Sequence, residues 1–212
     1  RVACLPLAGA QAAIQLVPRL RPAGRAAVLG PTYNEHTAAF AAAGWSVAEV
    51  SDLDALTGYD AVTLVNPNNP DGRRWPPEEV AALTARNGLV VVDESFADVT
   101  PETSLCPRLG APGLVVLRSF GKFFGLAGLR LGFALGSEAE IAALREAAGP
   151  WPASGPALAA GGLALSDGDW IRATRARLAF HSRRLDALAT GVGWSLVGGT
   201  GLFRLYATPD AG

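Results

Sequence analysis

Short apolar runs that alternate with helical segments restrict the fold of this chain more than any other feature of its sequence. The runs at residues 89–93 and 114–119 are rich in β-branched side chains, which is typical of strands buried on both faces. Such alternation predicts an α/β domain with a mostly parallel sheet flanked by helices. The expected strands are residues 26–30, 45–50, 61–65, 89–93, 114–119 and 131–135. The expected helices are residues 10–20, 35–43, 77–86 and 137–148.

The C-terminal part of the sequence follows a helix that a capping box, Ser137-x-x-Glu140, is expected to open. Two helical patterns and then two strand patterns come next, at residues 154–165, 169–189, 194–197 and 202–206. We predict a large domain, 1–175, and the start of a small α+β domain, 176–212, joined by the long helix from about residue 169. The chain does not begin with Met and stops just after a strand pattern, so we expect both natural termini to be missing.

Charge and cysteine content narrow the classes of function. With 18 Lys and Arg against 19 Asp and Glu, the net charge of −1 argues against nucleic acid or a membrane surface as a partner. No apolar run approaches about 18 residues, so no membrane span is expected. Cys4 and Cys106 are too few for a disulfide framework, and neither they nor His36 and His181 have metal-ligand spacing. We therefore expect a cytoplasmic protein without a metal site.

Lys122 is the only lysine among the 18 Lys and Arg residues. An arginine cannot lose its proton in a protein, whereas a lysine amine can attack a carbonyl once burial or nearby charge lowers its pKa. A compositional bias toward Ala, Gly and Arg explains the absence of other lysines but not the retention of this one. Lys122 is therefore a candidate for amine chemistry.

Several polar residues fall where predicted strands end. Asn69, Asp93, Ser119 and Lys122 lie at or just past such ends, as does the turn 31–33. Open α/β sheets bind ligands at the carboxyl ends of their strands, so these residues are expected to converge in one crevice. Neighbours on a strand point to opposite faces, so Glu94 is expected to be structural or to lie at the edge of the crevice rather than to pair with Asp93 in catalysis.

A hydroxyl, an amine and a guanidinium occur close together in the segment from Ser119 through Lys122 to Arg130. This combination suits a phosphorylated aldehyde, because Lys122 can form a Schiff base while Ser119 and Arg130 bind phosphate. A predicted helix start adds backbone N–H groups and the positive end of a helix dipole for the same phosphate. The residues at that helix start are Gly9, Ala10 and Gln11.

Four motifs together resemble those of fold-type I, class I/II aminotransferase-like enzymes. Ser-x-x-Lys122 followed by Gly-Leu-x-Gly-Leu-Arg130-x-Gly is similar to the pyridoxal-phosphate segment of that family. Asn69-Pro-Asp-Gly resembles its Asn-Pro-Thr-Gly loop, and Asp93-Glu-Ser-Phe resembles its Asp-Glu-Ala-Tyr segment. The turn Pro-Thr-Tyr33 resembles its ring-stacking loop, and the order and spacing agree across the set.

The resemblance implies a pyridoxal 5′-phosphate cofactor and a role for each matching residue. Lys122 would carry the cofactor as a Schiff base and then move protons as a general base and acid. Asp93 would accept the pyridinium N–H and keep the ring an electron sink, Asn69 would donate to O3′, and Tyr33 would stack on the ring. The resemblance further implies a homodimer with its site at the subunit interface.

One departure from the family pattern bears on the reaction. The family's aminotransferases carry Tyr three residues after the Asp, whereas this chain carries Phe96 and lacks that hydroxyl donor. A segment ending in Phe resembles the branch that decarboxylates L-threonine O-3-phosphate in cobalamin biosynthesis. There the Cα–carboxylate bond would break and Cα would be reprotonated. The expected substrate is a small phosphorylated amino acid, and the alternative interpretation is an aminotransferase of the histidinol-phosphate type.

Overall fold

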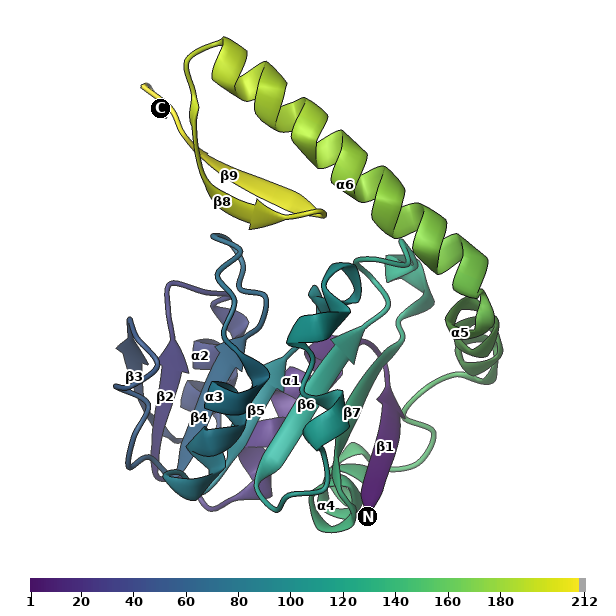
Figure 1. Ribbon diagram of the computed structural model, residues 1–212. Coiled ribbons are helices and arrows are strands. Elements are labelled where there is room, and N and C mark those ends of the chain that lie inside the picture. The colour runs from purple at the N-terminus through teal and green to yellow at the C-terminus, as the bar shows by residue number, and fades with distance from the viewer. Residues whose placement is uncertain (210–212) are drawn as a thin grey trace.

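The computed structural model describes residues 1–209, so positions 210–212 of the predicted small domain lie outside the described residues. Its main sheet has seven strands in the order β1-β7-β6-β5-β4-β2-β3 (Figure 1). β7 runs antiparallel to β1 and β6, and the other neighbouring strands pair in parallel, which confirms the mostly parallel sheet. The strands are β1 (Val2–Leu7), β2 (Arg25–Leu29), β3 (Ser46–Val50), β4 (Ala61–Val65), β5 (Val90–Asp93), β6 (Leu114–Ser119) and β7 (Gly132–Ser137).

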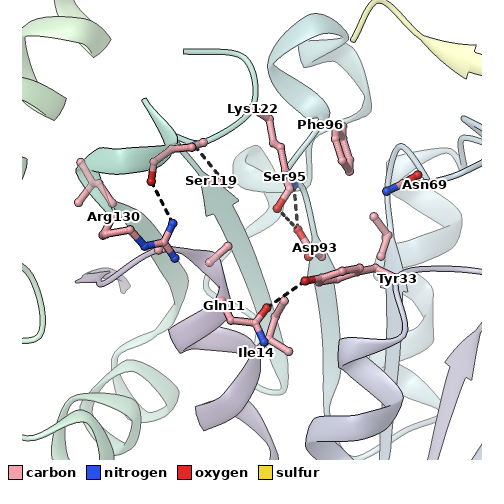
Figure 2. Close-up of a pocket in the computed structure, with 16 residues that line it drawn as sticks. Gln11, Ile14, Tyr33, Asn69, Asp93, Ser95, Phe96, Ser119, Lys122 and Arg130 are labelled. Atoms are coloured by element: carbon pink, nitrogen blue, oxygen red, sulfur yellow. Dashed lines mark hydrogen bonds between the residues drawn. The ribbon is translucent and has the colours of Figure 1, made fainter. Parts of the chain in front are cut away.

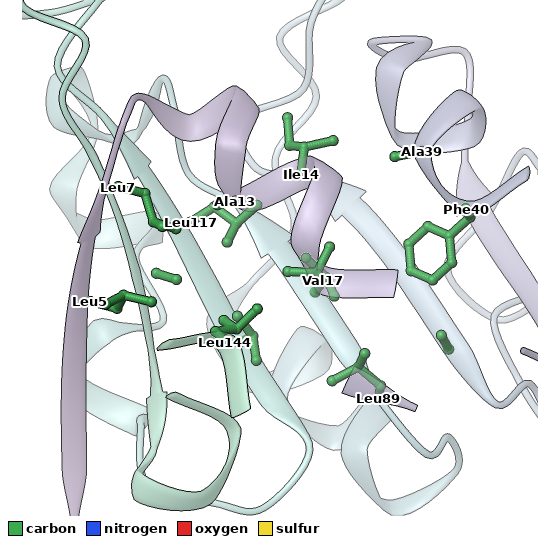
Figure 3. Packing of buried hydrophobic residues seen from close by; sticks show 14 of the residues in the cluster. Leu5, Leu7, Ala13, Ile14, Val17, Ala39, Phe40, Leu89, Leu117 and Leu144 are labelled. Carbon is green, nitrogen blue, oxygen red and sulfur yellow. The ribbon is translucent and has the colours of Figure 1, made fainter. Parts of the chain in front are cut away.

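Helices cover both faces of this sheet, and the alternation of side chains along each strand decides which residue faces which layer. On β5, Val91 packs in a cluster with α1 (Ala10–Leu16), α2 (Glu35–Ala42) and α4 (Glu138–Ala148), part of which is shown in Figure 3. The neighbouring Val90 and Val92 join a second cluster with α3 (Pro77–Ala82) on the opposite face. Burial on both faces explains why the central strands are continuously apolar.

The chain then leaves the sheet through two further helices. α5 (Gly155–Ser166) leads into the long α6 (Gly168–Gly191), and α6 leads to a separate two-stranded sheet of β8 (Ser195–Thr200) and β9 (Phe203–Ala207). Figure 1 shows this hairpin above the ends of the central strands. The small second sheet is as predicted, whereas the domain boundary at residue 175 stays a prediction. None of the helices within residues 1–209 is long and apolar enough to cross a membrane.

Glycines allow the hairpin to approach the main sheet closely. A Cβ atom on Gly72 would lie 2.2 Å from the carbonyl oxygen of Gly199, and one on Gly198 would lie 2.0 Å from that of Asp71. The two backbones therefore touch where any side chain would be excluded. This contact places the hairpin beside the loop that follows β4.

Three local expectations differ from the structure. The helix expected over 10–20 ends at Leu16 and continues as a 3-10 turn, and the helix over 77–86 becomes a 3-10 turn from Leu83. Ser137 is the N-cap of α4, but its hydroxyl makes no capping bond to the backbone and donates to Glu140 instead. The buried carboxylate of Glu140 also accepts from the amide of Gly113, so tertiary contacts replace the predicted capping box.

Candidate active site

A cavity of about 240 Å³ opens at the carboxyl ends of β5 and β6, next to the start of α1 (Figure 2). Every residue that the sequence assigned to the site lines this cavity, although the roles assigned to them stay predictions. These residues are Gly9, Ala10, Gln11, Tyr33, Asn69, Asp93, Ser119, Lys122 and Arg130. The other lining residues are Ile14, Val65, Ser95, Phe96, Gly121, Ala127 and Leu131.

Strand periodicity explains why Asp93 and Ser119 meet in this cavity. Val91 on β5 and Leu117 on β6 both pack in the cluster beneath α1. Two residues further along, each strand ends in a polar side chain on that same face. The site therefore lies in the same layer as this apolar cluster, between the sheet and α1, and begins where polar side chains replace the apolar ones.

Asp93 is buried, with 3% of its surface exposed, and three protein groups donate hydrogen bonds to its carboxylate. Its Oδ1 accepts from the backbone N of Ser95 at 2.9 Å and from the Oγ of Ser95 at 2.6 Å. Its Oδ2 lies 3.1 Å from Nε2 of His36. Burial raises the pKa of Asp93, but the interactions with His36 and Ser95 outweigh burial and hold the pKa below its usual value. The carboxylate is thus kept ionised and fixed in orientation.

His36 is a part of the site that sequence reasoning did not assign. It is fully buried on α2, three residues after Tyr33, and the two rings meet edge to face with centroids 6.3 Å apart. Because an ionised carboxylate can only accept, Nε2 of His36 is the donor to Asp93. Spacing by three residues was the available signal, since it places both side chains on one side of a helix start. His181, by contrast, is exposed on α6, away from these residues.

Lys122 lies in the turn after β6, and its amine faces an aromatic ring. Its Nζ is 5.6 Å from the centroid of the Phe96 ring, within the range of a cation–π contact. Phe96 in turn packs edge to face on Phe203 of β9, with centroids 4.9 Å apart. The small sheet therefore packs against a residue of the cavity wall. Because that residue is Phe96, the wall has an aromatic C–H at the position where a tyrosine would have a hydroxyl.

The other end of the cavity is suited to an anion. Arg130 has a left-handed backbone, and its guanidinium fills the space beside Gly9, where a Cβ atom would lie 2.7 Å from Nη2. The amide of Gly9 is already bonded to the carbonyl of Leu7, so this predicted donor is not free. Ala10 and Gln11, as the first residues of α1, have amides without partners inside the helix.

Tyr33 stands at the mouth of the cavity, with 42% of its surface exposed. Its hydroxyl donates to Oε1 of Gln11 at 3.4 Å, and Nε2 of Gln11 donates to Glu35 at 2.6 Å. These bonds connect the turn before α2 to the start of α1. Figure 2 shows Tyr33 and Asn69 on the side of Asp93 opposite to Arg130.

Glu94 points away from the cavity, as expected for the neighbour of Asp93 on a strand. It is fully buried and accepts from the Ser104 hydroxyl at 2.6 Å and from the Leu105 amide at 2.6 Å. Nη1 of Arg118 lies 3.4 Å from Oε2 of Glu94, and Nη2 of Arg118 forms an ion pair with Asp98. Burial raises the pKa of Glu94 despite these contacts. The network is a structural support beneath the site.

Comparisons with known proteins agree with this geometry. A threonine-phosphate decarboxylase of Pseudomonas aeruginosa is 47% identical over 97% of this chain, which spans 64% of that relative's length. A histidinol-phosphate aminotransferase of Desulfitobacterium hafniense is 32% identical over 68% of the chain and 46% of that relative. The crystal structure of histidinol-phosphate aminotransferase from Sinorhizobium meliloti in complex with pyridoxal-5'-phosphate superposes with a TM-score of 0.83. It is 24% identical and matches 94% of this chain and 59% of its own, which shows a shared fold.

The family resemblance inferred from four short motifs extends over nearly the whole sequence. The family described as aminotransferase class I and II matches residues 1–211. Both the motif residues and the segments between them are covered by this match. The chain therefore belongs to the class I and II aminotransferase family.

Proposed function

We propose that the cavity binds pyridoxal 5′-phosphate. The residues present fit this group, because the cavity offers an amine, an ionised buried carboxylate and an anion-binding end (Figure 2). Gly9 leaves the Arg130 guanidinium in its present place at this end, since a Cβ atom at residue 9 would lie 2.7 Å from Nη2 and force the guanidinium to shift. An aldehyde, a basic ring nitrogen and a phosphate each find a chemically matched partner.

Each residue would contribute through its own chemistry. Lys122 would hold the cofactor covalently, and Asp93 would accept the N–H of its ring. The remaining contacts would come from Asn69 to the ring oxygen, Tyr33 to the ring face, and Ser119, Arg130, Ala10 and Gln11 to the phosphate. When bound, the cofactor supplies an electron sink for the bond that breaks at the substrate Cα.

The reaction that we propose is decarboxylation of L-threonine O-3-phosphate to an aminopropanol phosphate, in cobalamin biosynthesis, by the whole protein to which this chain corresponds. The observation that carries this proposal is the 47% identity to the Pseudomonas aeruginosa decarboxylase across 97% of the chain. Phe96 supports it, because the hydroxyl expected of the family's aminotransferases is absent from the wall facing Lys122. Lys122 would then deliver a proton to Cα after carbon dioxide leaves.

Carbon dioxide release separates this reaction from its alternative. The full-length enzyme loaded with pyridoxal phosphate is expected to release carbon dioxide from phosphothreonine stoichiometrically without a 2-oxoacid, because decarboxylation needs no amino acceptor. Trapping the gas from carboxyl-labelled substrate, while the amine product is counted, measures this.

The matched control is histidinol phosphate with 2-oxoglutarate, since the related aminotransferases share the fold and 32% identity. Turnover that depends strictly on 2-oxoglutarate, with no gas released, would show that the protein is an aminotransferase instead. Addition of 2-oxoglutarate to the decarboxylation reaction should leave its rate unchanged.

We also propose that the protein is a cytoplasmic homodimer with α5 in its interface. α5 contains no charged residue, yet Leu158, Leu163 and Leu165 are exposed on it. An uncharged, apolar helix of this kind is ordinarily buried, so a partner surface is expected to cover it. The two free cysteines, Cys4 and Cys106, suit a reducing compartment.

A charged substitution on α5 tests whether this helix lies in the subunit interface. Leu163, with 76% of its surface exposed, should tolerate arginine in a folded subunit but not in an apolar contact between subunits. Sedimentation of the full-length protein is expected to give a dimer, and Leu163→Arg is expected to shift it to the monomer while circular dichroism is unchanged. A monomeric wild-type protein, or a variant that stays fully dimeric, would disprove this placement.

A further inference from the structure

Ser95 is a cavity residue to which neither the motifs nor the proposed chemistry assigns a role. It stands where the corresponding family segment, Asp-Glu-Ala-Tyr, carries alanine. Its side chain is buried, with 6% of the residue exposed, and its Oγ donates to Oδ1 of Asp93 at 2.6 Å. The backbone N of Ser95 donates to the same oxygen at 2.9 Å and would do so with alanine as well. The hydroxyl is therefore an addition to the motif.

The hydroxyl changes how many acceptor positions Asp93 has left. An ionised carboxylate offers about four lone-pair positions. The backbone N of Ser95, its Oγ and Nε2 of His36 occupy three of them in residues 1–209. The other titratable side chains that line the cavity, Tyr33, Lys122 and Arg130, make no hydrogen bond to this carboxylate. One acceptor position thus remains, on a carboxylate that itself lines the cavity.

Two physical effects follow from this arrangement. Bonds to both oxygens prevent the carboxylate from rotating, so the free position keeps a single direction. Hydrogen bonds to the charged form also make a carboxylate a weaker base, so a proton shared with a ring nitrogen stays on the nitrogen. Both effects favour a cationic N–H donor over a neutral ring.

We propose that Ser95 is a positioning residue that acts through Asp93 to select and hold a protonated ring nitrogen of the cofactor. The inference rests on the proposed binding of pyridoxal phosphate but not on which reaction follows. Ser95 itself would make no bond to the ring. Its contribution should therefore vanish when the ring has no nitrogen for Asp93 to bind.

The test compares the affinity of two ligands for the full-length apoenzyme. One is pyridoxal 5′-phosphate and the other is its 1-deaza analogue, which keeps the aldehyde and phosphate but has carbon in place of the ring nitrogen. For Ser95→Ala we expect pyridoxal phosphate to bind about tenfold more weakly, as for loss of a bond to a charged group. The affinity for the analogue should change less than about twofold.

Ser104→Ala is the matched control, because its hydroxyl makes the same 2.6 Å bond to the neighbouring buried carboxylate of Glu94, outside the cavity. It should change neither affinity by more than about twofold. Ser95→Thr, which keeps a hydroxyl, should restore preference for the ring nitrogen. Equal weakening of both ligands in Ser95→Ala, or no weakening, would overturn the inference. Failure of the wild-type protein to bind pyridoxal phosphate at all would instead refute the proposed cofactor.

Discussion

Replacing Lys122 with alanine is expected to abolish covalent retention of pyridoxal phosphate and to lower turnover about 10⁴-fold. The reason is that the cavity contains no other amine among residues 1–209, and its remaining cation, Arg130, cannot lose a proton. Borohydride reduction followed by peptide mass spectrometry measures the result directly. The wild-type protein should carry the added mass on the peptide that contains Lys122.

Lys122→Arg is the appropriate control for charge. It keeps a cation beside the Phe96 ring but cannot act as a nucleophile, so it should fail in the same way as the alanine variant. Cofactor fixed covalently in Lys122→Ala at wild-type yield would show that the assignment of this residue is wrong. Phosphate-dependent binding without a covalent bond is expected to persist in both variants, since Ser119 and Arg130 remain.

The second large effect is expected from Asp93→Asn, which should lower turnover about 10²- to 10³-fold, comparable to the loss of one preorganised electrostatic partner. The amide removes the charge, and its NH₂ group can face a donor of Ser95 or His36. Steady-state kinetics should show the loss mainly in kcat, because the charge acts on the electron sink. Glu94→Gln, which alters the adjacent buried acid outside the cavity, should affect stability far more than turnover.

The same substitution has a pH signature in the apoprotein. The folded-state pKa of Asp93 is lowered from 3.8, so its ionised form stabilises the fold above that pH, and this stabilisation is lost as pH falls through the lower folded value. Glu94 and Asp98 have raised pKa values and act in the opposite sense. The free energy of unfolding of the wild type minus that of Asp93→Asn should therefore shrink below about pH 4. A difference independent of pH from 3 to 6 would contradict this account of Asp93.

Much of the site could be predicted because its residues are recognisable from short stretches of sequence. Lys122 is alone of its kind, and Asp93 and Ser119 end strands whose apolar alternation is visible in the sequence. Carboxyl ends of parallel strands share one edge of a sheet, so residues far apart in sequence could be placed in one cavity. The site thus followed from local pattern plus one general rule of α/β topology.

The errors have a common cause, which is competition from partners that are distant in the sequence. Gly9 was expected to offer its amide to a ligand, but that amide is taken by Leu7. Glu140 was expected to cap its own helix and instead bonds Gly113. His36 carried no recognisable spacing with Asp93, from which it is 57 positions away. The local sequence does not determine these hydrogen-bond partners, because each partner depends on which groups the fold brings within bonding distance.

The sequence by itself therefore determined the layers of the fold, the edge of the sheet that holds the cavity, and which lysine amine lines that cavity. These depend on side-chain periodicity and on residue chemistry, both of which are local. Tertiary structure alone decided how Asp93 is charged and aimed, through His36 and Ser95, and how Phe203 of the small sheet backs the ring that faces Lys122. Those properties depend on burial and on hydrogen bonds between separate elements, which exist only once the chain has folded.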